Sequence, residues 1–294
     1  MMKPQMESFN QKVRFENAYG VELFIKRDDV LHKEISGNKF RKLKYNLEAA
    51  KEAGKKKLLT FGGAYSNHIA AVAAAGKYFG FETIGIIRGD ELLDKFLENP
   101  TLRKAYEDGM QFEFVSRGQF RNKYDALFLE RLKQLYGDYY LIPEGGTNHL
   151  AVKGCGEILN NDDEFFDVIC CAVGTGGTVS GLVNASRPHQ VVLGFPALKG
   201  DFLTDEIRIY AENDRWKLVT DYHFGGYAKI NNELKQFMQY FFNENLISLD
   251  PVYTSKMVFG VFDLITKGYF APGTKVLMIH TGGLQGLQSK IAEI

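Results

Sequence analysis

The segment SGNKFRK, residues 36–42, joins a sharp turn to the start of an amphipathic helix and carries Lys39 at its centre. Gly37 and Asn38 allow the backbone to turn. Apolar side chains then recur at helical spacing from Phe40 as far as Ala50, which predicts one buried helix face. Lys39 therefore lies where a loop meets a helix.

The sequence around Lys39 is strongly cationic, with Arg41, Lys42 and Lys44 close behind it. Like charge nearby favours the neutral, nucleophilic form of a lysine. A lysine of this kind can form a Schiff base with a carbonyl compound. A solvated basic helix face is the alternative interpretation of the same residues, so the rest of the sequence has to decide between the two.

The composition is that of an ordinary globular protein, with 45% hydrophobic residues among 294. That length allows one large domain or two modest ones. Lys+Arg and Asp+Glu are equal at 36 each, which argues against nucleic acid or a membrane surface as the partner and for a small molecule. Residues 1–11 are polar and no apolar run is long enough to span a bilayer, so we expect a cytoplasmic protein.

Three cysteines cannot make a disulfide framework, and they lack the Cys/His spacing of a zinc site. The histidines have no metal-like partners at suitable spacing, so no metal site is predicted. Cys170 and Cys171 lie in an apolar run and are expected in a buried strand.

Short strand-like segments alternate with longer helix-like segments along most of the chain. The expected strands are 21–25, 58–61, 82–88, 111–115, 139–142, 166–173, 191–195 and 275–279. The expected helices, besides the one at Lys39, are 67–79, one between 91 and 107, 119–136, 149–159, one containing Ser180 and Gly181, 231–242 and 253–267. This alternation predicts an α/β fold with mostly parallel sheets and helices on both faces.

The second half of the chain repeats this architecture, and no Pro/Gly/Ser-rich linker marks a boundary. We expect two closely packed domains, with the chain crossing between them near residues 45 and 145. The larger domain would comprise residues 1–45 and 146–294, and the smaller α/β domain residues 46–145.

Ligands of open α/β sheets bind at the carboxyl ends of strands, and the first strand-end loop of interest is GGAYSNH, residues 62–68. Its glycines free the backbone, and Ser66, Asn67 and His68 meet the N-terminus of the next helix. Backbone N–H groups there suit a carboxylate or a phosphate. Simple capping of the helix by Ser66 or Asn67 is the alternative, and capping does not exclude contact with a ligand.

The second loop, GTGGT at residues 174–178, resembles a phosphate cradle, because no bulky side chain blocks the backbone N–H groups. A dinucleotide motif would need glycine at the position of Val179, and no lysine follows as in a P-loop. The phosphate of another compound is therefore the better interpretation. A third loop, HTGG at residues 280–283, offers similar groups or forms a tight turn.

Together these segments resemble one known family. The motifs, in order, are GNKxRK (37–42), GG with SNH (62–68), GGTN (145–148), GTGGT (174–178), DPVYT (250–254) and HTGG (280–283). They occur in this order in the 1-aminocyclopropane-1-carboxylate deaminase and D-cysteine desulfhydrase family, and the resemblance covers nearly the whole chain. It implies two open, twisted, mostly parallel sheets of the tryptophan synthase β-like fold (fold type II), a cofactor-binding larger domain, and pyridoxal 5'-phosphate as cofactor.

The resemblance also implies roles for individual residues. Lys39 would hold the cofactor as a Schiff base and later shuttle protons. Lys42 would hold the cofactor phosphate together with the loop residues Gly174, Thr175, Gly176, Gly177 and Thr178. Asn67 would contact the ring hydroxyl, and the substrate carboxylate would be received by Ser66, Asn67 and His68.

Two tyrosines are expected to face the substrate by the same resemblance. Tyr253 matches the DPVYT motif, and Tyr227 matches less securely because the glycine and proline that usually follow it are absent. Tyr222 is the alternative candidate. The chain is also shorter than is typical between Phe195 and Thr220, where a strand is expected to lead into the tyrosine segment.

Thr254 and Thr281 match the desulfhydrase branch, whereas the deaminase branch has glutamate and leucine there. A carboxylate at the pyridine nitrogen, which Thr254 is expected to approach, would favour a protonated ring, whereas a hydroxyl suffices when a thiolate leaves. The resemblance thus implies that Lys39 takes the α proton of D-cysteine and sulfide leaves, giving pyruvate and ammonia, with Ser66 and Tyr253 assisting.

Other reactions fit the same residues. Deamination of D-serine or of 1-aminocyclopropane-1-carboxylate, and racemisation, are alternatives of the same class. A non-catalytic binder of a phosphorylated metabolite is an alternative of another class, against which the intact Lys39 argues. A homodimer is expected from the family resemblance.

Overall fold

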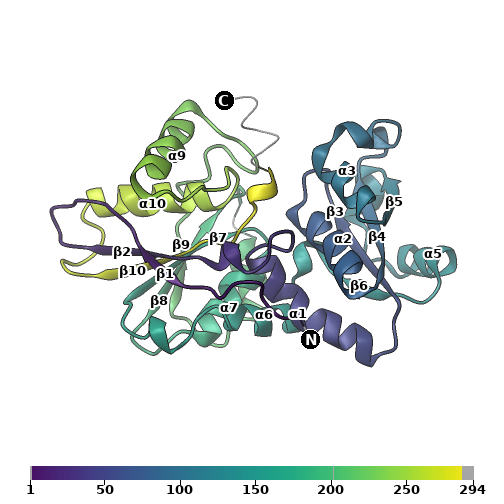
Figure 1. Ribbon diagram of the computed structural model, residues 1–294, viewed down its shortest axis with the longest axis horizontal. Coiled ribbons are helices and arrows are strands. Elements are labelled where there is room, and N and C mark those ends of the chain that lie inside the picture. Colours follow the sequence, from purple (N-terminus) through teal and green to yellow (C-terminus); the bar gives the residue numbers. More distant parts are fainter. Residues whose placement is uncertain (1, 201, 287–294) are drawn as a thin grey trace.

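The computed structural model describes residues 2–200 and 202–286, which form two α/β lobes side by side (Figure 1). In the larger lobe a six-stranded sheet has the order β1-β2-β10-β7-β8-β9. Its strands are β1 (Asn10–Lys12), β2 (Glu22–Lys26), β7 (Val168–Val173), β8 (Val191–Pro196), β9 (Trp216–Leu218) and β10 (Lys275–Ile279). All neighbouring pairs are parallel except β1 with β2.

The smaller lobe contains a four-stranded, fully parallel sheet of order β5-β4-β3-β6. Its strands are β3 (Lys57–Gly62), β4 (Glu82–Arg88), β5 (Met110–Val115) and β6 (Tyr140–Ile142). The strands of the large sheet thus come from residues 1–45 and 146–294, and those of the small sheet from residues 46–145, as the predicted division of the chain requires. The domain boundaries near residues 45 and 145 stay a prediction. The predicted fold class, with two mostly parallel sheets, is confirmed.

Ten α-helices are present in the described residues. They are α1 (Asn38–Glu52), α2 (Asn67–Phe79), α3 (Pro100–Glu107), α4 (Arg117–Arg121), α5 (Ala126–Tyr136), α6 (His149–Gly156), α7 (Gly177–Ala185), α8 (Leu203–Arg208), α9 (Asn232–Asn245) and α10 (Thr254–Thr266). Short 3-10 helices occupy Asp28–Val30, Asp90–Leu92, Phe96–Glu98, Glu144–Gly146, Asn161–Asp163 and Leu284–Gly286. Within these residues no helix is long and apolar enough to cross a membrane.

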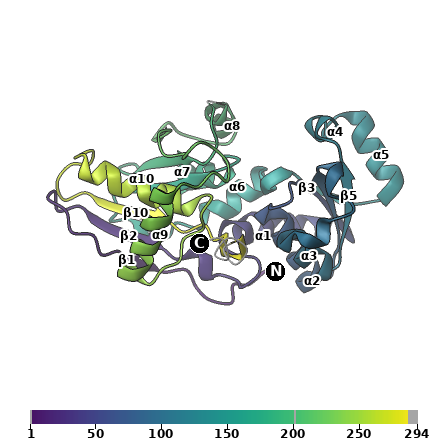
Figure 2. The same ribbon diagram turned by 90° about the horizontal axis from the view of Figure 1, so that it is seen from above.

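Helices cover both faces of the large sheet, with α9 and α10 on one side and α6 and α7 on the other (Figures 1 and 2). The central strand β7 shows why, because its side chains alternate between two hydrophobic clusters. Cys170 and Ala172 pack in the cluster that includes residues of α10, and Cys171 and Val173 pack in the cluster that includes residues of α7. The prediction of buried strand cysteines is confirmed, and all three cysteines are free.

The helix predicted between residues 91 and 107 is present as α3, which begins at Pro100 because proline starts a helix readily but disfavours helical backbone in the residue before it. One other predicted helix is interrupted. The segment 119–136 divides into α4 and α5. Tyr124 lies between these helices, where its ring packs edge-on against Phe61 at 5.6 Å and its hydroxyl accepts from the Glu144 N–H at 3.0 Å.

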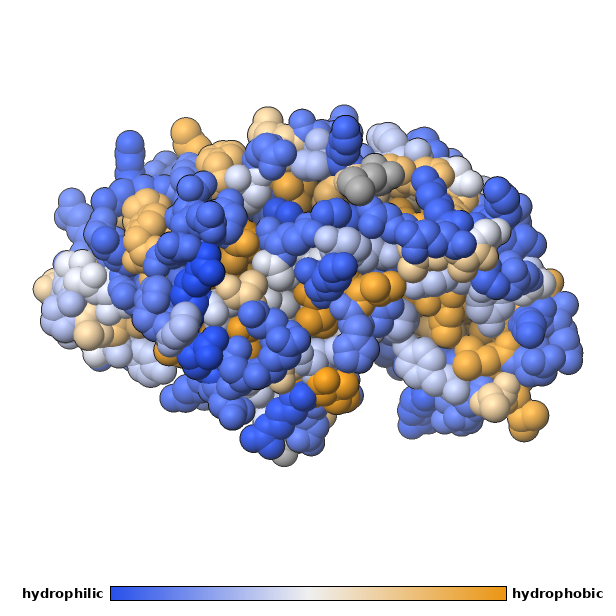
Figure 3. Space-filling view, turned by 90° about the horizontal axis from the view of Figure 1, so that it is seen from below, coloured by the Kyte–Doolittle hydropathy of each residue, from blue (hydrophilic) through white to orange (hydrophobic). Residues whose placement is uncertain are grey.

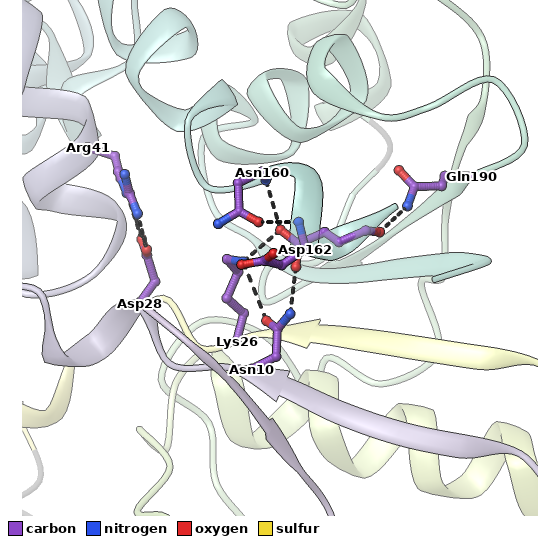
Figure 4. Close-up of polar contacts among 8 residues, drawn as sticks. Asn10, Lys26, Asp28, Arg41, Asn160, Asp162 and Gln190 are labelled. Atoms are coloured by element: carbon purple, nitrogen blue, oxygen red, sulfur yellow. Dashed lines mark hydrogen bonds and ion pairs between the residues drawn. The ribbon is translucent and has the colours of Figure 1, made fainter. Parts of the chain in front are cut away.

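A buried polar cluster ties the first strands to the segment between α6 and β7 (Figure 4). Lys26 at the end of β2 forms an ion pair with Asp163 at 2.6 Å, and both side chains are 2% exposed. Asn10 of β1 donates to the same carboxylate at 2.7 Å. Next to this cluster, Arg41 of α1 contacts Asp28 at 2.7 Å, just after β2. These contacts fix the start of α1 relative to the large sheet.

The face seen from below is mostly hydrophilic, with apolar side chains scattered over it and a notch in the outline between the two lobes (Figure 3). The carboxyl ends of both sheets point toward one cavity. The cavity has a volume of about 620 Å³ and is lined by loops that follow β3, β7 and β10 and by the end of β4.

Candidate active site

Lys39 lies in the first turn of α1 and lines this cavity. The preceding Gly37 has φ +57°, and a Cβ there would lie 2.1 Å from the Thr281 carbonyl oxygen. Only glycine permits so close an approach. The Asn38 N–H then donates to the same carbonyl at 3.2 Å. The loop after β10 is thereby packed against the start of α1, and the two together place Lys39 at the cavity wall.

The amine of Lys39 has a lowered pKa. Burial lowers its pKa to about 7, and the nearby charge of Lys42 acts in the same direction. A substantial share of the molecules therefore carries Lys39 as the free amine near neutral pH. Two of the cations predicted to surround it are neutralised instead, because Arg41 contacts Asp28 and Lys44 contacts Glu157, each at 2.7 Å. Burial, rather than a crowd of positive charge, is the main cause of the shift.

Lys42 is a buried cation without a carboxylate partner among the described residues. Its Nζ donates to the Gly145 carbonyl at 3.0 Å, to Thr147 Oγ1 at 2.9 Å and to Thr175 Oγ1 at 3.3 Å. Lys42 is only 2% exposed, and this burial lowers the pKa of its ammonium group. An unpaired buried charge is unfavourable, so this lysine is suited to hold an anion that arrives with a ligand.

The glycine-rich loop after β7 lies beside Lys42. Gly174, Thr175, Gly176 and Thr178 line the cavity. Thr175 Oγ1 lies 2.6 Å from Thr147 Oγ1, so both hydroxyls are held beside Lys42. Gly177, between Gly176 and Thr178, does not itself line the cavity, and its predicted part in holding the phosphate stays a prediction. A Cβ on Gly177 would lie 2.8 Å from the Thr147 side chain, so this glycine lets α7 begin close to Thr147.

The predicted carboxylate loop also lines the cavity through Ser66, Asn67 and His68. Ser66 caps α2, because its Oγ accepts the Ile69 N–H at 3.3 Å, so the capping interpretation is confirmed as well. Asn67 Oδ1 accepts from Gln285 Nε2 at 3.1 Å. The N-terminus of a helix of this length provides free N–H groups and a partial positive charge for a carboxylate.

His68 is buried and neutral. Its Nε2 lies 2.8 Å from Thr60 Oγ1, and its Nδ1 has no hydrogen-bond partner among the described residues. Burial, and then the charges of Lys39 and Lys42, hold the pKa of its imidazole well below the usual value. The ring therefore supplies no positive charge to a substrate carboxylate, which limits its predicted role to hydrogen bonding.

Two tyrosines line the cavity from the large lobe, Tyr227 and Tyr253, with ring centroids 6.0 Å apart. Burial raises the pKa of both hydroxyls, so both stay protonated near neutral pH. The alternative candidate, Tyr222, packs in the core and donates its hydroxyl to Asp263 at 2.7 Å. The structure thus brings Tyr227, and not Tyr222, to the cavity.

The two threonines that distinguish the branches lie differently. Thr281 lines the cavity and is 8% exposed. Thr254 is fully buried and does not line the cavity, and its hydroxyl donates to Asp250 Oδ2 at 2.5 Å. In the structure the Thr254 hydroxyl is thus engaged with Asp250, and its approach to the cofactor ring stays a prediction.

Several lining residues were not predicted from the sequence. Asn38 is one, with its Nδ2 donating to Thr178 Oγ1 at 2.9 Å. Arg88 is another, at the carboxyl end of β4, and Glu144 a third. The signal for Arg88 was available, because a charged residue that ends a predicted parallel strand lies at the ligand-binding edge of the sheet.

The comparisons with known proteins agree with this geometry. The family model described as "Pyridoxal-phosphate dependent enzyme" matches residues 11–282. A buried lysine with a pKa of about 7, next to the buried cation of Lys42 and the glycine-rich loop after β7, fits this cofactor. The chain is a pyridoxal-phosphate-dependent enzyme with the tryptophan synthase β-like fold, fold type II.

Relatives narrow the family. The chain is 35% identical over 290 residues to a Pyrococcus horikoshii protein named "Putative 1-aminocyclopropane-1-carboxylate deaminase", covering 91% of this chain and 86% of the relative. It is 32% identical to the Arabidopsis thaliana bifunctional D-cysteine desulfhydrase/1-aminocyclopropane-1-carboxylate deaminase. That match covers 94% of this chain and 75% of the relative. The crystal structure of an ACC deaminase homologue superposes on this chain with a TM-score of 0.82 at 29% identity. The superposition covers 99% of this chain and 94% of the homologue. The chain belongs to the 1-aminocyclopropane-1-carboxylate deaminase and D-cysteine desulfhydrase family.

Proposed function

We propose that this enzyme carries out β-elimination on a small D-amino acid, with D-cysteine as the main substrate. D-Cysteine and water would give pyruvate, ammonia and hydrogen sulfide. The bound cofactor withdraws electrons from the α carbon, so that the α proton and the thiol group can both leave.

In this proposal Lys39 attaches the cofactor and later takes the α proton. A pKa of about 7 makes its amine available as nucleophile and as base at neutral pH. Lys42 and the hydroxyls of Thr147 and Thr175 hold the phosphate, with backbone N–H groups of the loop 174–178. When the cofactor binds, its phosphate would provide the buried charge of Lys42 with a negatively charged partner.

The substrate would lie between the two lobes. Its carboxylate would accept hydrogen bonds from Ser66, Asn67 and the backbone at the start of α2. Tyr253 and Tyr227 keep their protons near neutral pH, because burial raises their pKa. Each can therefore donate a hydrogen bond to the departing sulfur or to the substrate amino group.

The observation that carries the choice of D-cysteine is the lack of an inner carboxylate. Among the described lining residues only Glu91 and Glu144 are acidic. Glu91 is paired with Arg117 at 3.2 Å and Glu144 with Lys123 at 3.1 Å. The inner wall instead offers the hydroxyl of Thr281. Without a carboxylate to strengthen electron withdrawal, the site favours a substrate with a good leaving group.

The test is a panel of amino acids assayed with the holoenzyme for pyruvate, 2-oxobutyrate and sulfide. D-Cysteine and β-chloro-D-alanine should give pyruvate faster than 1-aminocyclopropane-1-carboxylate gives 2-oxobutyrate. A preference for the cyclopropane compound would refute the choice of substrate, and reaction with L-amino acids alone would refute the proposed placement of the carboxylate.

The second candidate is deamination of 1-aminocyclopropane-1-carboxylate, which the names of the relatives favour. The same lysine and phosphate site serve both reactions, so the panel decides between them. The proposal extends to a homodimer in the cytoplasm, which the family resemblance supports. Light scattering of the purified protein tests the dimer, since a mass near 33.2 kDa would indicate a monomer instead.

A further inference from the structure

Arg88 is the last residue of β4 and lies at the rim of the cavity. Its guanidinium is stacked over the Phe120 ring, with 5.8 Å from Cζ to the centroid. Its Nη2 lies 3.6 Å from the position that a Cβ on Gly63 would occupy. The side chain is therefore directed over the loop that leads to Ser66, and its stacking on an aromatic ring holds it in place.

Each of the other charged residues that line the cavity either serves the cofactor in the proposed function or forms an ion pair within the protein. At the inner end, Lys39 and Lys42 serve the cofactor in the proposed function. At the rim, Arg117 is paired with Glu91, and Glu144 is paired with Lys123. Within residues 2–200 and 202–286, no carboxylate lies within ion-pair distance of Arg88. Arg88 is thus a positive charge at the rim without a carboxylate partner in the described part of the chain.

Arg88 also faces the side of the cavity where the substrate would lie. Its charge acts on Tyr227, whose pKa it lowers while burial has the larger, raising effect. Tyr227 comes from the large lobe and Arg88 from the small lobe, and both line the same cavity as Ser66. D-Cysteine has a neutral thiol and makes no use of such a cation.

We propose that Arg88 binds a second negative charge on the substrate, so that the enzyme accepts small D-amino acids with an anionic group on the β carbon. This inference rests on the proposed function only in placing the α-carboxylate at Ser66 and Asn67. Guanidinium groups bind carboxylates and phosphates in the same way, through paired N–H donors. Both kinds of β substituent therefore fall within the class.

O-Phospho-D-serine illustrates the class as a substrate. Lys39 takes the α proton, the bond between the β carbon and oxygen breaks, and its electron pair leaves with the phosphate. Addition of water then gives pyruvate, ammonia and inorganic phosphate.

The experiment compares the binding of D-aspartate and D-asparagine to the holoenzyme by calorimetry. These ligands have nearly the same shape and differ in the charge of the β substituent. We expect D-aspartate to bind about tenfold more tightly, because a charge-assisted contact at an exposed rim has moderate strength. Arg88→Gln should bring the ratio of the two dissociation constants close to one, and Arg88→Lys should keep part of the preference.

Arg117→Gln is the matched control, because Arg117 lines the same rim but is paired with Glu91. This variant should keep the wild-type ratio. The inference is overturned if wild type binds both ligands equally or binds neither, or if Arg117→Gln changes the ratio as much as Arg88→Gln. It is also overturned if Arg88→Gln weakens both ligands equally, which would assign Arg88 to the α-carboxylate. The calorimetric experiment measures binding and needs no turnover. A failure of the proposed D-cysteine elimination would appear only in the amino-acid panel, so the two failures can be told apart.

Discussion

Replacing Lys42 with methionine separates cofactor binding from stability in one variant. The Lys42 ammonium is buried, and its partners are neutral oxygens of Gly145, Thr147 and Thr175. Methionine fills a similar volume without the charge. The variant removes a cation that is unfavourable in the apoprotein and needed in the holoenzyme.

The expected effect on affinity follows from the loss of a charge-assisted contact to the cofactor phosphate. Hydrogen bonds to charged groups contribute about 1.5–3 kcal/mol, and each 1.4 kcal/mol is a factor of ten. The dissociation constant of pyridoxal phosphate should therefore rise about 10- to 100-fold. The apoprotein should keep its free energy of unfolding within about 1 kcal/mol or gain stability, because the hydroxyls of Thr147 and Thr175 still bind each other at 2.6 Å.

The assay titrates the apoprotein with the cofactor by absorbance and measures urea unfolding of the apoprotein in parallel. Lys44→Met on the same helix is the control, since Lys44 is paired with Glu157 at 2.7 Å and lies away from the cavity lining. That control should leave cofactor affinity unchanged. If Lys42→Met lowers apoprotein stability by as much as it lowers cofactor binding, Lys42 is a structural residue and the reasoning is refuted.

Three further predictions address the lysines and Thr254. In the apoprotein, the rate of acetylation of Lys39 should rise with pH around an inflection of about 7, because only the free amine reacts; an inflection above 10 would contradict the lowered pKa. Thr254→Val should lower the free energy of unfolding by about 1–2 kcal/mol but change the ratio of D-cysteine to 1-aminocyclopropane-1-carboxylate turnover less than twofold; a large change of ratio would place Thr254 at the ring after all. Lys26→Met should cost about 3–5 kcal/mol in urea unfolding because it leaves Asp163 buried and unpaired, whereas Lys12→Met in an exposed pair should cost less than about 1 kcal/mol; equal costs would refute the role of burial.

The long periodic segments and the strand-end loops could be predicted from the sequence. The alternation of strands and helices predicts mostly parallel sheet covered by helices, since hydrophobic periodicity is a local signal, and the family resemblance implies that there are two sheets. Ligands bind at the carboxyl ends of parallel strands, so each of the loops 62–68, 174–178 and 280–283 could be singled out, and all three reach the cavity.

Features that depend on tertiary contacts could not be predicted in this way. The interruption between α4 and α5 places Tyr124 on Phe61, a partner distant in the sequence. The Thr254 hydroxyl donates a hydrogen bond to Asp250, and the charge of Arg41 is neutralised by Asp28. A pattern identifies which residue types are present, but the partner of each polar group is decided by packing.

The most direct test of the account is to find the lysine that holds the cofactor. The holoenzyme is reduced with borohydride, digested and mapped by mass spectrometry. The reduced pyridoxyl group should be found on Lys39, and Lys39→Ala should abolish the label while the protein still folds. A label on any other lysine, or no bound cofactor after reconstitution, would contradict it.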